Sequence, residues 1–304
     1  MNQKIKRKNL SMENVIFTTL NSAFLIVISI AMVYPLFNTL AISFNEGMDT
    51  VRGGIYLWPR IFSLQNYRVV LNMDTIYSAF IISVTKTIVT VVTNLFFTAM
   101  LAYTLSRKEY IFNKAITIIF VLTMYFSAGL IPNYMLIKNL NMINTFSVYW
   151  VPNIISAFNL IVMRTYIKSI PESFIESAKI DGAREVRIFL QIILPLSVPT
   201  LATIGLFVAV GSWNSWFDTL LYCSAKQSLS TLQYELQKLL ASAMSAGNSQ
   251  GGANSAAQSG VGNVTTPQSI RAAITIVTAV PILLVYPFLQ RFFVSGITLG
   301  GVKG

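Results

Sequence analysis

Six apolar stretches, separated by more polar segments, account for much of the chain. They run over Val15–Phe44, Ala79–Leu105, Ala115–Pro132, Phe146–Met163, Pro195–Phe217 and Ala272–Leu289. A helix of about 20 residues crosses the roughly 30 Å hydrocarbon core of a bilayer. The pattern therefore predicts six membrane-spanning helices.

These stretches are nearly continuous in Ile, Leu, Val, Phe and Ala, without the alternation of apolar and polar residues that marks the strands of a membrane barrel. A continuous apolar segment that crosses lipid satisfies its backbone hydrogen bonds only as a helix. We therefore expect an all-α polytopic membrane protein, formed by a single domain over residues 1–304 and without an internal repeat.

Composition also indicates a membrane protein. Hydrophobic residues make up 54% of the 304 residues and charged residues only 11%, whereas about a quarter of residues are charged in soluble domains. The basic residues behind the net charge of +11 lie beside the predicted spans, so anionic lipid headgroups explain them better than nucleic acid does. Cys223 is the only cysteine, which excludes an intrachain disulfide, and there is no histidine.

The lysines and arginines predict an orientation. With the N-terminus inside, fourteen of them fall on inner segments and seven on outer segments, although the outer segments are longer in total. The positive-inside rule then places residues 1–14 and 290–304 in the cytoplasm. The basic flank before Val15 is typical of a signal peptide, but the apolar run behind it is too long and has no small-residue cleavage site, so we expect an uncleaved first span.

Two long outer segments differ in character. The first, Asn45–Ser78, mixes aromatic and polar residues, which suits the headgroup level; it would lie along the membrane surface, either as an aromatic belt or as a docking site. The second, 218–270, begins with an amphipathic pattern over Leu229–Leu240 and continues as a Gly/Ser/Asn/Ala tract that predicts a mobile loop. In the sequence between these two segments, Gly129 and Pro132 are expected to break the third span as it leaves the membrane.

The one sizeable inner segment, 164–194, predicts two short helices. Ser169-Ile-Pro-Glu172 has the form of a capping box, in which Ser169 accepts a hydrogen bond from the backbone three residues on and Glu172 reaches back. The first helix would begin there. Its spacing places Phe174 and Ala178 on one face.

This first helix is expected to end at Asp181-Gly182, because glycine adopts the left-handed conformation that caps helix C-termini. A second helix would start near Ala183 and meet the membrane at Leu194-Pro195. A stiff short helix tied to a span could receive motion from a soluble motor subunit, but an amphipathic helix that rests on lipid has the same pattern. The pattern alone leaves both interpretations open.

A specific motif lies within this segment. Glu176-Ser-Ala, Gly182, Ile192 and Leu194-Pro195 resemble, in their spacing, the EAA signature of bacterial binding-protein-dependent ABC importers, with Ser177 at a position that is usually alanine. Nearly the whole chain resembles the second permease of carbohydrate importers, the maltose-permease G-subunit type. Four segments resemble the branch associated with oligosaccharides and polysaccharide fragments, namely residues 126–132, 163–165, 211–218 and 296–304.

The resemblance implies a type I ABC importer permease fold in the bacterial cytoplasmic membrane. It also implies that the inner loop is the coupling helix, which docks in a cleft of the ATPase subunit. Glu176 would pair with a basic group of the ATPase, Ala178 would permit close packing, and Gly182 would set the docking angle. The implied coupling residues are Glu176, Ser177, Ala178, Asp181, Gly182, Ala183, Leu194 and Pro195.

The resemblance further implies the partners of the chain. In maltose-type relatives the C-terminal tail reaches between the two ATPase subunits, so it would do so here, with a frayed terminus as the alternative; the tail residues are Gly300, Gly301, Val302, Lys303 and Gly304. The chain has no Gly-x-x-x-x-Gly-Lys-Ser/Thr phosphate loop, so the two ATPase subunits would bind ATP and Mg²⁺, and this chain would hold no cofactor or metal. A second permease and an extracytoplasmic solute-binding protein would complete the importer.

Polar side chains within the spans are candidates for the sugar path, because such groups tend to face a cavity or the bundle interior. They are Asn94, Asn153, Asn159, Trp213, Asn214 and Trp216. Interfacial tryptophans and amide bonds between helices explain the same residues, and the partner permease supplies most of the site in the maltose-type system. Both interpretations stay open. Lys86 is expected to extend outward to the membrane surface.

Other classes of protein fit less well. A membrane enzyme would need acid/base or metal-ligand sets, and the spans contain neither histidine nor a carboxylate pair. A secondary transporter would be expected to show ionisable residues at the midplane of the membrane and an internal repeat, and neither is visible in the sequence. We therefore expect a non-enzymatic importer subunit for a carbohydrate, in particular an oligosaccharide, with a polyol or an amino acid as the alternative substrate.

Overall fold

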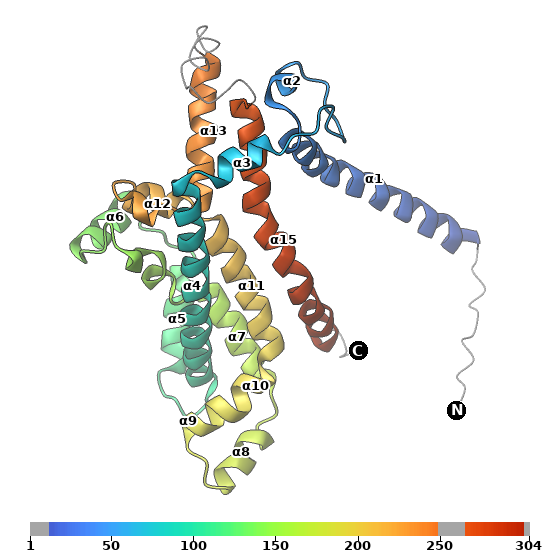
Figure 1. Ribbon diagram of the computed structural model, residues 1–304. Helices are drawn as coiled ribbons and strands as arrows, with labels where there is room; N and C mark the ends of the chain where they lie inside the picture. Colours follow the sequence, from blue (N-terminus) through green and yellow to red (C-terminus); the bar gives the residue numbers. More distant parts are fainter. Residues whose placement is uncertain (1–11, 249–264, 301–304) are drawn as a thin grey trace. The chain divides into compact units, whose positions relative to one another are not determined.

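The computed structural model describes residues 12–248 and 265–300, and these are built from helices (Figure 1). Within these ranges the only β pairing is an isolated bridge between Asn45 and Phe62. The predicted all-α fold is therefore confirmed. Most of the predicted Gly/Ser-rich tract, residues 249–264, lies outside the described residues, as do residues 1–11 and 301–304.

The chain forms two compact units. Unit 1 holds residues 1–70 and 246–276, and unit 2 holds residues 71–245 and 277–304. Helix α15 (Pro267–Gly300) begins in unit 1 and continues into unit 2.

Unit 1 starts with α1 (Met12–Ser43), followed by α2 (Gly47–Val51) and α3 (Gln65–Leu71), whose last residue passes into unit 2. The apolar part of α1 runs from Val15 to Ser43, and none of its most apolar window is buried against the rest of the chain. Its apolar side chains are therefore free to contact lipid or another subunit.

The outer segment of unit 1 is organised around buried amides. Asn45 accepts the backbone N–H groups of Arg60 and Ile61 at 2.8 and 2.9 Å and donates to Asp49 at 3.1 Å. Asn66 donates to the carbonyl of Asn45 at 2.8 Å and accepts the hydroxyl of Ser269, at the start of α15, at the same distance. The segment is therefore a folded element, and its position at the membrane surface stays a prediction.

Helix α4 (Asp74–Ser106) is the centre of unit 2 and packs against α7 (Ala157–Ser169) and α11 (Val198–Asn214) (Figure 1). Small residues on α4, such as Ala99 and Ala102, are fully buried and let the helices approach closely. The other elements of the unit are α5 (Asn113–Thr123), α6 (Leu130–Asn139), the 3-10 helices η1 (Phe146–Tyr149), η2 (Val151–Asn153) and η4 (Gln227–Leu229), α8 (Ser173–Ile180), α9 (Glu185–Ile188), the π-helix η3 (Phe189–Ile193), α10 (Leu194–Leu196), α12 (Phe217–Tyr222) and α13 (Leu232–Asn248).

The predicted spans differ in continuity. Three helices, α1, α4 and α15, are long and apolar enough to cross a membrane. The predicted fourth and fifth spans are helix pairs bent by 46° (η1–η2 with α7) and 78° (α9–α10 with α11). The predicted third span contains only the 11-residue α5, which at ~1.5 Å per residue is about 16 Å long. The described residues thus do not confirm six spans.

The break after α5 arises differently from the prediction. Gly129, with φ of 84°, precedes α6 in a backbone conformation that favours glycine. Pro132 does not break a helix, because it lies in the first turn of α6, where its missing N–H has no helical partner to lose.

The predicted outer segment 218–270 contains a helix of 17 residues before the Gly/Ser-rich tract. The amphipathic pattern at Leu229–Leu240 corresponds to α13, which begins at Leu232 and continues to Asn248. Leu232 is fully buried, and its backbone N–H donates to Ser83 of α4 at 2.8 Å. This part of the loop is therefore packed on the bundle.

Candidate functional site

Two regions of unit 2 carry the functional candidates: the inner helical loop and a polar cavity beside α4. In Figure 1 the loop, α8 and α9, lies at one end of the bundle, and α12 and α13 lie at the other. Residues of α4 contribute to both regions.

Helix α8 ends as the sequence predicts. Gly182 has a φ of 76°, and the N–H groups of Gly182 and Ala183 donate to the carbonyls of Lys179 and Ala178 at 3.0 and 2.9 Å. This pair of bonds is the Schellman arrangement, which satisfies the last carbonyls of a helix and turns the chain sharply. The direction of α8 relative to α9 is therefore set by one glycine.

The predicted capping box at the start of α8 is wrong. Helix α7 extends through Ser169, whose hydroxyl donates back to the Tyr166 carbonyl at 2.7 Å, and α8 begins only at Ser173. Glu172 precedes α8 without a side-chain capping bond and pairs with Lys108 at 3.1 Å. The hydroxyl is thus already used by the preceding helix, and the carboxylate by a lysine of the neighbouring loop.

The two faces of α8 differ in exposure. Ile175 and Ala178 are buried and belong to the apolar core that α4 and α7 form. On the other side Phe174 is half exposed and Ile180 is 86% exposed. The sequence placed Phe174 with Ala178 on one face, whereas the structure buries only Ala178. An anchored inner face and an apolar, acidic outer face suit a helix that docks on a partner.

The predicted coupling residues follow this division. Ala178 is buried, and Ala183 and Leu194 are half-buried. The others are exposed: Glu176, Ser177, Asp181, Gly182 and Pro195.

A polar network ties the loop to α4. Tyr103, near the end of α4, donates its hydroxyl to Glu185 at 2.5 Å, and Lys179 of α8 pairs with the same carboxylate at 3.1 Å. Lys179 also reaches Glu109 at 3.5 Å, and the ring of Tyr103 stacks on Phe189. Side-chain contacts therefore join α8, α9 and α4 to one another.

This network perturbs the titration of the loop residues. The hydrogen bond from Tyr103, followed by the contact with Lys179, lowers the pKa of Glu185. The hydrogen bond with Glu185 raises the pKa of Lys179. A lowered carboxyl pKa stabilises the folded loop above the unfolded pKa, and this contribution is lost as the pH falls through the folded value. The network is therefore complete at neutral pH and weakens in acid.

Between α9 and α11 the chain changes from α to π geometry. The π-helix η3 immediately precedes Leu194-Pro195, and proline has no N–H for the bond to the carbonyl four residues earlier. Ser197 then donates its N–H to the carbonyls of Ile193 and Leu194 at 2.9 and 3.1 Å. The predicted proline is thus the point at which the loop turns into the fifth apolar segment.

The second region is a polar cavity of ≈ 280 Å³ beside α4. Three of the predicted path residues line it together: Asn94, Asn153 and Asn159. The Asn94 amide donates to the Asn153 carbonyl at 2.7 Å, while the Oδ1 atom of Asn94 has no partner. The Ser212 hydroxyl, also in the lining, has none either. The cavity is therefore lined mainly by polar residues, and two of these residues each have an enclosed polar atom without a hydrogen-bond partner.

Lys86 lies in this cavity, so the expectation that it extends outward is wrong. Its side chain is 2% exposed and its ammonium lies 3.6 Å from Asp218, 3.2 Å from the Ser215 carbonyl and 4.7 Å from the ring centre of Tyr149. A charge inside an apolar bundle is costly unless it has such partners. Its inward orientation follows from the presence of Asp218 on α12.

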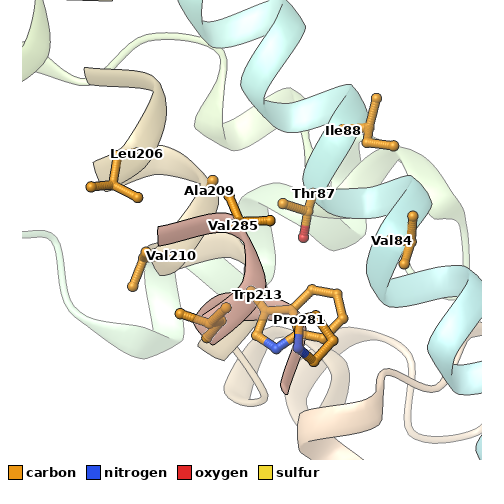
Figure 2. A pocket seen from close by; sticks show the side chains of 10 residues that line it. Val84, Thr87, Ile88, Leu206, Ala209, Val210, Trp213, Pro281 and Val285 are labelled. Atoms are coloured by element: carbon orange, nitrogen blue, oxygen red, sulfur yellow. The ribbon is translucent and has the colours of Figure 1, made fainter. Parts of the chain in front are cut away.

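The other predicted path residues lie elsewhere. Trp213 points into an apolar pocket between α4, α11 and α15, shown in Figure 2, and its indole N–H donates to the Thr278 carbonyl at 3.0 Å. Asn214 is exposed and donates to the carbonyl of Val210 within its own helix, and Trp216 packs edge-on against Phe217. None of these three lines the polar cavity.

Sequence reasoning missed Lys86, Thr90 and Asp218 as lining residues. A signal for the first two was present: polar residues recur every three or four positions along one face of α4, at Ser83, Lys86, Thr90, Asn94 and Thr98, all of which are buried. Such a stripe in an apolar helix predicts a polar interior. Asp218 carried no comparable signal, because it is a single acidic residue at the start of the predicted outer segment 218–270. Gly300 of the predicted tail is the last residue of α15.

Comparisons with known proteins give a consistent set. No family model matches the sequence. The polygalacturonan/rhamnogalacturonan transport system permease protein YtcP of Bacillus subtilis is 36% identical over 96% of this chain and 100% of its own. The galactooligosaccharides transport system permease protein GanQ of the same organism is 31% identical over 95% of both chains. A chain of a bacterial ABC transporter involved in the import of the acidic polysaccharide alginate has a TM-score of 0.84 at 28% identity, covering 93% of this chain and 98% of that one.

Proposed function

The chain belongs to the sugar permease subunits of ABC transporters, and we propose that it forms half of the membrane channel of an oligosaccharide importer driven by separate ATPase subunits. The single observation that carries the coupling part of this proposal is helix α8, a short helix with a buried inner face, an exposed outer face and a glycine-set end. The names of the relatives support an oligosaccharide as the transported substrate.

In this proposal α8 receives the motion of the ATPase. Phe174 and Ile180 would insert their exposed apolar side chains into a cleft of the ATPase, and Glu176 would pair with a basic group there. Displacement of α8 would reach α4 through the bonds that join Lys179, Glu185 and Tyr103. Because α4 contacts both α7 and α11, a shift at its end would reorient the two helices that line the polar cavity.

The partners of the chain belong to the same proposal. Two ATPase subunits would bind ATP and Mg²⁺, and the C-terminal tail would lie between them. A second permease would cover apolar surface such as that of α1, which the chain itself leaves open. A solute-binding protein outside the cell would deliver the sugar. Both termini would then be cytoplasmic, which the distribution of lysine and arginine supports.

Cross-linking tests the docking of α8. In a Cys223→Ser background, Phe174→Cys and Ile180→Cys should each cross-link to the ATPase subunit in the assembled complex, because both side chains point away from the bundle. Ile175→Cys is the matched control, since Ile175 lies on the same helix and is 4% exposed.

The expected result is a cross-linked band on denaturing gels for the two exposed positions and none for Ile175→Cys, with similar assembly of all three complexes. Cross-linking at none of the positions in an assembled complex, or cross-linking of the binding protein instead, would contradict the assignment of α8 to the ATPase.

A further inference from the structure

The polar cavity beside α4 has features that helix packing alone does not explain. It is lined by side chains from α4, η2, α7, α11 and α12, and Asn153 and Gly211 of its lining are exposed. Most of the lining is polar, with Thr90, Asn159 and Ser215 among the residues that contribute. A cavity of this kind suits a ligand rich in hydroxyl groups, such as a sugar.

The same cavity contains a positive charge. Lys86 is 1% exposed, and its ammonium carries three donors, of which one meets the Ser215 carbonyl. Asp218, the carboxylate nearest to it, stands 3.6 Å away, its side chain is 32% exposed, and it also accepts the hydroxyl of Ser215. The ion pair is therefore asymmetric, with a buried cation and a carboxylate that is partly solvated and has a second donor.

We propose that this cavity binds one uronate residue of an acidic oligosaccharide, and that Lys86 binds its carboxylate. The proposal rests on the oligosaccharide import proposed above and deepens it by naming the class of sugar. When the uronate enters, Lys86 exchanges Asp218 for the carboxylate of the sugar, while Asp218 keeps the Ser215 hydroxyl and its contact with water.

A neutral sugar fits the polar lining but offers no charge to Lys86. It leaves the Lys86–Asp218 pair intact, so its passage does not depend on the charge of Lys86. An acidic sugar in a cavity without Lys86 would meet Asp218 with no cation between them, and like charges at short range repel. Lys86 is therefore a residue that determines specificity for the acidic sugar.

The test uses the full complex in proteoliposomes, with ATP hydrolysis stimulated by binding protein loaded either with trigalacturonate or with its methyl ester, which has the same rings without the charges. Lys86→Met removes the charge and keeps much of the side-chain volume, and Lys86→Arg keeps the charge. The binding protein is common to all variants, so the ratio of variant to wild-type rate isolates the permease.

For Lys86→Met we expect at least a tenfold loss of stimulation by trigalacturonate and less than a twofold loss with the ester. Lys86→Arg should restore most of the response. An equal loss with both sugars in an assembled Lys86→Met complex would show that Lys86 is only structural and would overturn the proposal. If no oligosaccharide, acidic or neutral, stimulates the wild type, the proposed import function fails instead.

Discussion

At the scale of single residues, Gly182 has the most defined role. Its φ of 76° lies in the left-handed region, and a Cβ built at this position meets no atom within 4 Å. A larger residue would therefore cost conformational free energy, about 1–2 kcal/mol, rather than cause a clash. Because this residue sets the turn between α8 and α9, a substitution here would change the direction of α8 relative to α9.

Gly182→Val should accordingly weaken the coupling of ATP hydrolysis to sugar delivery, because a β-branched side chain disfavours the left-handed conformation most. Gly182→Asn is the matched control, since asparagine tolerates this conformation. We expect sugar-stimulated ATPase activity to fall several-fold for the valine variant and to stay near the wild-type rate for the asparagine variant. Equal activities in correctly assembled complexes would show that the turn does not depend on backbone conformation.

At the scale of elements, Tyr103 and Glu185 form the polar contact that joins the second short helix to α4. Tyr103→Phe keeps the ring that stacks on Phe189 and removes only the hydroxyl. Since the Glu185 side chain is about half exposed, the loss should be about 1 kcal/mol. We expect a lower thermal transition of the purified complex and a smaller ATPase response to sugar, with ATP binding unchanged.

Lys108→Ala provides the comparison, because it removes an exposed ion pair between the loop that follows α4 and the residue that precedes α8. Lys108 and Glu172 are 83% and 47% exposed, so solvent screens their attraction. This variant should keep both the thermal transition and the ATPase response of the wild type. A larger effect for Lys108→Ala than for Tyr103→Phe would mean that the exposed pair, and not the buried hydroxyl, connects the loop to α4.

The same elements show what the sequence could and could not predict. The end of α8 was predictable, because glycine at a helix C-terminus acts through the local backbone. The start was not, because the use of Ser169 depends on how far α7 extends, and that is decided by packing of α7 on α4. Lys86 was misjudged for the same reason: its partner Asp218 lies far along the chain, so only the folded bundle brings the two together.

At the scale of the whole molecule, the apolar segments identified the membrane class correctly but not the continuity of the spans. Hydropathy measures only how apolar a segment is and does not predict the bends of 46° and 78° within the fourth and fifth apolar segments. The orientation across the membrane stays a prediction from the basic residues.

Labelling of single cysteines tests that orientation. In intact cells that carry the Cys223→Ser background, a membrane-impermeant maleimide should label Trp58→Cys, whose native side chain is 83% exposed in the outer segment. Ile180→Cys, at a position 86% exposed on α8, should react only after the membrane is permeabilised. The reverse labelling pattern would place the inner loop outside and would separate it from any cytoplasmic ATPase.

Uptake into proteoliposomes tests the central claim most directly. Vesicles would contain this chain with its partner permease and ATPase subunits, with ATP on the ATPase side and a binding protein loaded with labelled oligosaccharide on the other. We predict that sugar accumulates inside against its gradient only when ATP and the complete complex are present. Accumulation without ATP, or equal uptake by vesicles that lack this chain, would contradict the account.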